Sequence, residues 1–183
     1  MVEAEYPSIQ LEKLLGRPLN KIESKFKPKT IFYRGSMEIP LPCPRVSIIG
    51  SRSASKKGLL EAREIAMSLI ENEVVIVSGL AKGIDTIGHK TAIENGGRTI
   101  AVIGTPLNKT YPKENLELQE EIMKNHLVIS QYPVGHPTTP KDFVLRNRTM
   151  ALISNATVIV EAGESSGSLH QGWETLRIGR PLF

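Results

Sequence analysis

The sequence predicts an α/β protein with a doubly wound, mostly parallel sheet, arranged as an extended Rossmann-like fold. Short segments that are apolar throughout alternate along the chain with longer segments whose apolar residues recur at helical spacing. Strands without polar alternation are typical of a parallel sheet that helices cover on both faces. The length of 183 residues suits one such domain.

The expected strands are short runs of apolar and β-branched residues. Residues 30–33 are β-branched and aromatic, and we expect them at an edge of the sheet. The prolines of residues 40–44 cannot donate hydrogen bonds to a neighbouring strand, so this segment is expected to be a loop. The buried parallel strands are expected at 46–49, 74–77, 98–103, 127–130 and 157–160, and residues 181–183 begin a further strand.

A helix is expected after each buried strand. In the first of these segments Ala62, Ala66 and Ile70 recur every four residues, which places them on one helical face. Gly96 and Gly97 are expected to end the second helix. The expected helices cover 56–71, 84–94, 114–124, 142–153 and 168–178.

The N-terminal part of the chain differs in composition from the rest. Gly16 and Pro18 interrupt any long helix there, so residues 1–29 are expected to form a lead-in segment with one short helix. The Rossmann-like core domain is then expected at 30–183. Residues 1–60 hold 11 basic and 5 acidic side chains, whereas residues 61–183 hold 12 and 14. A basic surface of this size either attracts a polyanion or is an ordinary solvated face.

Several classes of protein are disfavoured by the composition. The apolar runs are far shorter than the roughly 20 residues of a membrane helix, and no secretory signal precedes them. The single cysteine, Cys43, excludes an internal disulfide, and the four histidines lack the spacing of metal ligands. We therefore expect a soluble, cytoplasmic protein with no membrane contact, no metal and no cofactor.

Glycine and hydroxyl residues gather at the carboxyl ends of the expected strands, the edge where ligands bind to parallel sheets. Backbone amides at helix N-termini suit phosphate oxygens, and Arg52 and Lys82 would add positive charge there. Glycines after strands also serve turn geometry, and serines such as Ser53 and Ser55 also serve as helix N-caps. The candidate phosphate-binding residues are Gly50, Ser51, Arg52, Ser78, Gly79, Lys82, Gly83, Gly104, Ser166, Gly167 and Ser168.

The expected helix at 142–153 adds an aromatic side chain flanked by basic and amide groups, namely Phe143, Arg146, Asn147 and Arg148. An aromatic ring for base stacking beside guanidinium groups for phosphates is typical of single-strand binding. In the alternative interpretation Phe143 belongs to the core and the arginines are solvated. Helical spacing alone does not decide between the two.

No motif in the sequence predicts catalysis. The chain lacks GxGxxG and the P-loop GxxxxGK[ST]. Asp85 and His89 would share a helix face, but both follow Ser78 too closely to form a triad with it, so we expect a structural role for them. Glu161 is the one carboxylate placed for general-base chemistry, and its alternative role is to accept hydrogen bonds from neighbouring loop amides.

Three motifs occur in a characteristic order: SGLAKGID from Ser78, FxxRNR from Phe143 and ExxxxSGSL from Glu161. With them, the chain from about Tyr33 to its end closely resembles the DNA processing protein A (DprA/Smf) family. The resemblance implies a protein without catalysis that binds single-stranded DNA and loads a RecA-type recombinase onto it during natural transformation. It also implies a homodimer, and a DNA pocket formed by Gly50, Ser51, Arg52, the loop 78–83, Phe143, Arg146 and Arg148.

The chain departs from the family pattern in two places. Gln171, Trp173 and Glu174 make the last expected helix unusual. The C-terminal winged-helix-like domain that often follows in the family is expected to be absent, since the sequence ends at Phe183.

The second hypothesis is a nucleotide-handling protein of the same superfamily, either a small-nucleotide sensor or a phosphoribohydrolase similar to the LOG enzymes. Those enzymes carry PGGxGTxxE, and residues 161–168 lack both the PGG and the nearby TxxE. This difference favours the DNA binder. A third option is a domain whose crevice is vestigial and which serves only for dimerisation.

Overall fold

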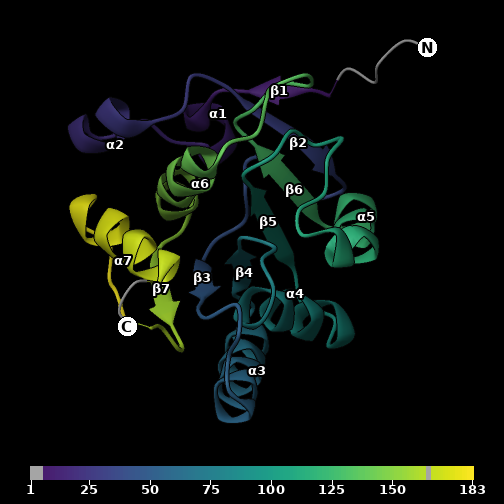
Figure 1. Cartoon of the computed structure of the whole chain (residues 1–183). Helices are drawn as coiled ribbons and strands as arrows, with labels where there is room; N and C mark the ends of the chain where they lie inside the picture. Colours follow the sequence, from purple (N-terminus) through teal and green to yellow (C-terminus); the bar gives the residue numbers. More distant parts are fainter. Residues whose placement is uncertain (1–5, 164–165) are drawn as a thin grey trace.

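A computed structural model describes residues 6–163 and 166–183, and it contains one seven-stranded sheet (Figure 1). The strand order is β1-β2-β6-β5-β4-β3-β7. The strands from β6 to β7 are parallel, and β1 and β2 are antiparallel additions at one edge. The strands are β1 (Ser8–Ile9), β2 (Ile31–Gly35), β3 (Arg45–Ile49), β4 (Val75–Ser78), β5 (Thr99–Ile103), β6 (Leu127–Ser130) and β7 (Ala156–Ile159). The predicted α/β class with a mostly parallel sheet is confirmed.

The sheet reverses its winding direction at β3. The chain runs outward from β3 through β4 and β5 to β6, and later returns to place β7 on the other side of β3. The register pairs Val46 with Ala156 across that junction. In such a sheet the loops after the two strands diverge and leave a crevice at their carboxyl ends. The topology therefore positions a binding site at the β3–β7 junction.

Helices cover both faces of the sheet (Figure 1). Side chains alternate along β4, so that Val75 and Val77 pack in the cluster on the α1 and α6 face while Ile76 packs against α3 and α4. This two-sided burial explains why the strands are apolar at successive positions. The helices are α1 (Leu11–Leu15), α2 (Lys21–Phe26), α3 (Lys56–Glu71), α4 (Ile84–Glu94), α5 (Leu116–Asn125), α6 (Pro140–Ile153) and α7 (Gly167–Arg177), with a 3₁₀ turn at Lys113–Asn115.

The lead-in segment is more structured than the sequence indicated. The expectation of one short helix was wrong, because the described part of this segment contains β1, α1 and α2. Gly16, with φ of +67°, ends α1, and Asn20 begins α2 with a capping box to Glu23. The residues that would break one long helix thus separate two short ones. Leu11 and Leu14 are buried in the same cluster as the central strands.

The end of the chain lies beside β7. Leu182 bridges Thr157 in parallel, and the Phe183 N–H donates to the Thr157 carbonyl at 2.9 Å. The short strand expected at 181–183 is therefore confirmed as one isolated bridge. No helix in the described ranges combines the length and apolar character needed to cross a membrane.

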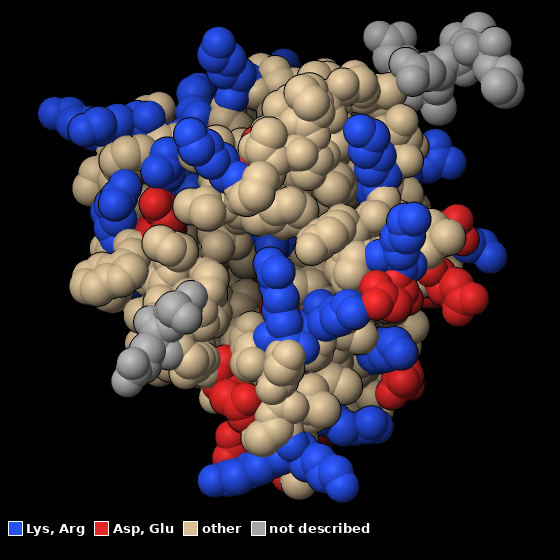
Figure 2. All heavy atoms as spheres, in the orientation of Figure 1, with Lys and Arg blue, Asp and Glu red and all other residues tan. Residues whose placement is uncertain are grey.

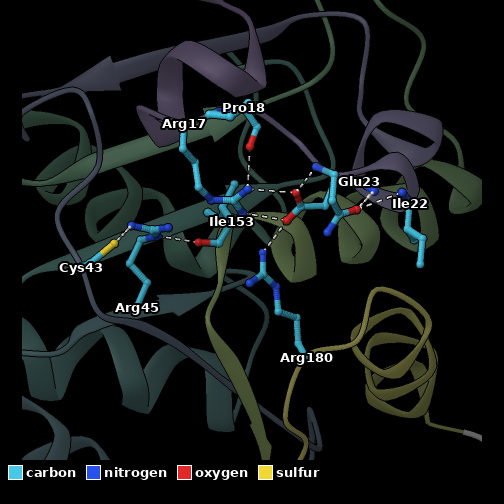
Figure 3. Close-up of polar contacts among 9 residues, drawn as sticks. Arg17, Pro18, Ile22, Glu23, Cys43, Arg45, Ile153 and Arg180 are labelled. Carbon is cyan, nitrogen blue, oxygen red and sulfur yellow. Dashed lines mark hydrogen bonds and ion pairs between the residues drawn. The ribbon is translucent and has the colours of Figure 1, made fainter.

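A buried ion-pair network connects the lead-in segment to the C-terminal end (Figure 3). The Glu23 carboxylate is 1% exposed and accepts from the Arg17 guanidinium at 2.7 and 2.9 Å and from Arg180 at 2.6 Å. The hydrogen bonds from Arg17 are the main cause that lowers the pKa of Glu23 from 4.5 to about 2. Nearby, the buried Arg45 guanidinium donates to the Ile153 carbonyl at 2.5 Å.

Candidate nucleic-acid interface

An open crevice of about 970 Å³ lies at the carboxyl ends of the central strands, between the start of α6 and the start of α7. Figure 2 shows Lys and Arg side chains near the middle of this face, over the loops that follow β3 and β4. A narrower recess of about 80 Å³ adjoins it. The crevice brings together the predicted residues Gly50, Ser51, Arg52, Phe143, Arg146, Asn147, Ser166, Gly167 and Ser168, and the recess adds Gly79 and Lys82.

The loop after β3 exposes a guanidinium group, whereas the polar groups of Ser51 bond within the protein. The Ser51 N–H donates to the Glu161 carbonyl at 2.6 Å, and the Ser51 hydroxyl accepts from the Ser53 N–H at 3.1 Å. At Gly50, a Cβ would stand 2.6 Å from Ile84 of α4, so this glycine serves close packing. Arg52 is exposed and lines both the crevice and the recess. It is the group of this loop that can meet a phosphate.

The backbone of the loop after β4 is hydrogen-bonded by side chains that were not among the predicted phosphate-binding residues. The Asp85 carboxylate accepts from the Gly79 and Ala81 N–H groups at 3.0 and 3.3 Å. Asn115 donates to the carbonyl of Leu80, which is fully buried and has φ of +59°. Ser78 is also buried and donates to the Ile48 carbonyl at 2.7 Å. The interpretation of Ser78 and of these amides as phosphate ligands therefore disagrees with the geometry.

Gly83 and Gly104 lie behind the crevice surface and act through packing. Gly83 precedes α4 with φ of +74°, and a Cβ there would stand 2.3 Å from the Ser51 carbonyl oxygen. A Cβ on Gly104 would stand 2.7 Å from the Phe143 ring. Neither glycine lines the crevice or the recess. They allow the loops and the ring to approach closely enough to shape the site.

Lys82 is 53% exposed and contacts the carboxylate of Glu114 at the edge of the recess. The sequence interpretation did not include Glu114. The hydrogen bond from Lys82 lowers the pKa of Glu114, so this carboxylate is charged at neutral pH. A phosphate that binds Lys82 would replace the carboxylate of Glu114 as the partner of this lysine.

The aromatic part of the site contains two rings. Phe143 is half-buried and lines both the crevice and the recess. Tyr111 lies beside it with ring centroids 5.1 Å apart at 54°, and is itself 54% exposed. Tyr111 was not among the predicted site residues. The signal that could have identified it is an aromatic residue in a loop that follows a strand end at this edge of the sheet.

Arg146 and Asn147 belong to the wall of the crevice and are bonded internally. Arg146 is 5% exposed and donates to the backbone carbonyls of Gly79 and Val102, the latter at 2.6 Å. Its Nε donates to the Asn147 side chain at 3.1 Å, and Asn147 donates to the Gly167 carbonyl at 3.2 Å. The geometry therefore assigns Arg146 to holding β4, β5 and α6 together, which departs from its predicted part in phosphate binding.

Arg148 lies outside the crevice, contrary to the sequence interpretation. Its Nε donates to the Glu174 carboxylate at 2.9 Å, and its guanidinium lies over the Phe26 ring at 4.9 Å. The reason is helical rotation, since at about 100° per residue the side chains of Arg146 and Arg148, two residues apart on α6, point about 200° apart. Two arginines at this spacing cannot both enter one pocket.

The start of α7 forms the remaining wall. Ser166 caps the helix by accepting from the Ser168 N–H at 3.1 Å, and Gly167 and Ser168 line the crevice beside it. The positive end of the helix dipole favours an anion at this position.

The groups considered for catalysis are occupied in structural roles. The Glu161 carboxylate accepts from the Ser55 N–H at 3.0 Å and from the Ser55 hydroxyl at 2.6 Å, and these bonds lower its pKa. Its interpretation as an acceptor for loop amides is confirmed. His89 is fully buried beside Thr99, and burial lowers its pKa to about 3, so it is neutral at pH 7. Within the described ranges, no three His, Cys, Asp or Glu residues are grouped to hold a metal.

The chain is similar to proteins of one family. The family model of DNA recombination-mediator protein A matches residues 1–183. The chain is 44% identical over 156 residues to DNA processing protein DprA of Streptococcus pneumoniae, an alignment that covers 85% of this chain and 55% of that protein. It is 39% identical over 159 residues to protein Smf of Synechocystis, with 85% and 40% covered. The chain thus spans about half the length of these curated relatives.

Solved structures agree with this similarity. DNA processing protein A of Streptococcus pneumoniae superposes with a TM-score of 0.84 at 39% identity, covering 97% of this chain and 62% of that one. DNA processing protein A of Helicobacter pylori, whose structure addresses its single-stranded DNA binding mode, superposes with a TM-score of 0.84 at 27% identity, with 99% and 80% covered. The molybdenum cofactor carrier protein of Chlamydomonas reinhardtii, at 18% identity and a TM-score of 0.53, covering 77% and 75%, shares the fold alone.

Proposed function

The chain belongs to the DNA recombination-mediator protein A family, and on that premise we propose that its crevice binds single-stranded DNA and presents it to a RecA-type recombinase. The observation that carries the proposal is the recess where Arg52 and Lys82 flank Phe143. Two cations can meet successive phosphates while the ring between them meets a base.

The wider role is proposed on the same basis. The family of recombination mediators and the relatives named DNA processing proteins support a part in DNA recombination. We propose that this part belongs to natural transformation and that the chain acts as a binder without catalysis. This role takes place in the cytoplasm, where the recombinase acts. Dimerisation is supported by Leu169, Trp173 and Leu176, which lie on α7 at i, i+4 and i+7 and are all exposed. Such an apolar stripe suits a second copy of the chain.

Removing either cation of the recess is expected to weaken single-strand binding and its salt dependence. Arg52→Ala and Lys82→Ala should each reduce the slope of log K against log salt by about 0.7, the value for one phosphate contact on a single strand. Fluorescence anisotropy with labelled oligothymidine at several salt concentrations measures this slope. Lys90→Ala, on the far side of the sheet in α4, is the control and should leave the slope unchanged. If both recess variants bind like the parent chain, the crevice does not hold the DNA.

Removing the Phe143 ring is expected to weaken single-strand binding by about 1–3 kcal/mol, because the stacked base loses its partner. Val144→Ala is the matched control, since Val144 is exposed, lines the same crevice and has no aromatic face. Thermal melting of both variants shows whether the loss arises from binding. A large drop in melting temperature with unchanged affinity would instead assign Phe143 to the core.

A further inference from the structure

A second group of basic side chains lies outside the crevice and surrounds an aromatic ring. We call it the outer cluster, and it consists of Lys21, Lys25, Phe26, Arg148 and Arg177. Figure 2 shows Lys and Arg side chains gathered over α2, apart from those at the middle of the face. The Phe26 ring joins three of them, with Lys25 Nζ, Arg148 Cζ and Arg177 Cζ at 5.4, 4.9 and 5.5 Å from its centroid. Lys21 lies one turn before Lys25 on α2.

The outer cluster keeps most of its positive charge. Glu174 contacts Arg148 at 2.9 Å and Arg177 at 3.5 Å, so one carboxylate serves two guanidinium groups. Lys21 and Lys25 are exposed, and no carboxylate of the described residues lies within ion-pairing distance of either. An aromatic ring orients cations without neutralising them. Guanidinium groups held in this way still present N–H donors to a phosphate.

Both helices that form the crevice wall lead to the outer cluster. On α6, Val144 lines the crevice and Arg148 follows one turn later on the same face. On α7, Gly167 lies at the crevice and Arg177 at the outer cluster, about 15 Å further along the axis at 1.5 Å per residue. A strand that leaves the crevice between these helices meets the cluster within a few nucleotides.

We propose that the outer cluster is a second contact surface for the phosphate backbone of single-stranded DNA, which takes the part of the strand that extends beyond the crevice. The inference rests on the proposed function of the crevice. It assigns a role to Lys21 and Lys25 of the lead-in segment and to Arg148, which the crevice does not use. It also predicts that long strands bind more tightly and with a steeper salt dependence than short ones.

The test compares two lengths of oligothymidine, one of about 6 nucleotides that fits the crevice alone and one of about 20 that reaches both surfaces. The variant Lys21→Gln/Lys25→Gln removes two exposed charges and leaves the buried side chains in place. We expect it to bind the long strand several-fold more weakly, with the salt slope lowered by about 0.7 for each phosphate that the variant no longer neutralises. Its affinity for the short strand should equal that of the parent chain.

The control is Lys90→Gln/Lys124→Gln, which removes the same charge from exposed positions on α4 and α5. It should bind both strands like the parent chain. Unchanged long-strand binding by Lys21→Gln/Lys25→Gln, or equal losses for both lengths, would overturn the outer cluster as a second surface. Arg52→Ala distinguishes failure of the outer cluster from failure of the crevice. If Arg52→Ala binds the short strand as tightly as the parent chain does, the crevice does not hold DNA and the proposed function itself fails.

Discussion

Replacing Arg146 with alanine is expected to lower the free energy of unfolding by about 3–5 kcal/mol, the usual effect of removing one partner from a buried charge pair. The substitution leaves the buried carbonyls of Gly79 and Val102 without their donor. It also removes the positive charge that offsets the buried Asp85 carboxylate, whose pKa burial already raises. Urea denaturation followed by circular dichroism measures the loss.

Arg148 provides the matched control for this prediction. It lies two residues further along α6, and its partner Glu174 keeps a second cation, Arg177 at 3.5 Å, when Arg148 is removed. Arg148→Ala should therefore lower the free energy of unfolding by clearly less than Arg146→Ala does. An Arg146→Ala protein that is as stable as the parent chain but binds single-stranded DNA more weakly would show that Arg146 is a phosphate ligand, contrary to this prediction.

Replacing Glu23 with alanine is expected to cost about 3–5 kcal/mol as well, since two guanidinium groups lose their shared carboxylate. Arg180 is mostly buried, so its charge cannot be fully hydrated in the variant. Glu12→Ala is the control, because the ion pair of Glu12 with Lys27 is about one-third exposed on both sides and should contribute less than about 1 kcal/mol. Equal stability of the two variants would show that the network does not hold the lead-in segment.

The same network predicts how stability depends on pH. The folded pKa of Glu23 is about 2, below its ordinary value of 4.5, so its contribution is complete above pH 4.5 and is lost as the pH falls toward 2. The shift corresponds to on the order of 3 kcal/mol. Glu23→Gln cannot titrate, so the stability difference between the parent chain and this variant should shrink over that window. A constant difference between pH 5 and pH 2 would contradict the assignment.

The central sheet could be predicted because burial on two faces leaves a direct pattern in the sequence. Ile76 and Val77 point to opposite faces of the sheet, and both are buried among apolar side chains. The sequence of β4 is therefore apolar at successive positions. The lead-in segment could not be predicted in the same way. Its helices are short, and their stability comes from tertiary contacts such as those of Leu14 and Glu23, which local spacing does not reveal.

The location of the site was predicted more accurately than the contacts that its residues make. Strand ends and glycines identify the edge of the sheet, and the crevice lies there. Which polar groups remain available depends on partners distant in sequence. The Arg146 guanidinium donates to the carbonyls of Gly79 and Val102, which lie 67 and 44 positions earlier in the chain. Arg148 is directed to Phe26, a residue 122 positions earlier in the chain.

A preference of the crevice for single-stranded DNA is measured by one titration. Labelled oligothymidine and its duplex with oligodeoxyadenosine are each titrated with the chain at low and moderate salt, and anisotropy is recorded. We expect tighter binding to the single strand, with an affinity that falls as salt rises. Equal affinity for the duplex, or no binding to the single strand at low salt while a nucleoside monophosphate binds, would contradict it.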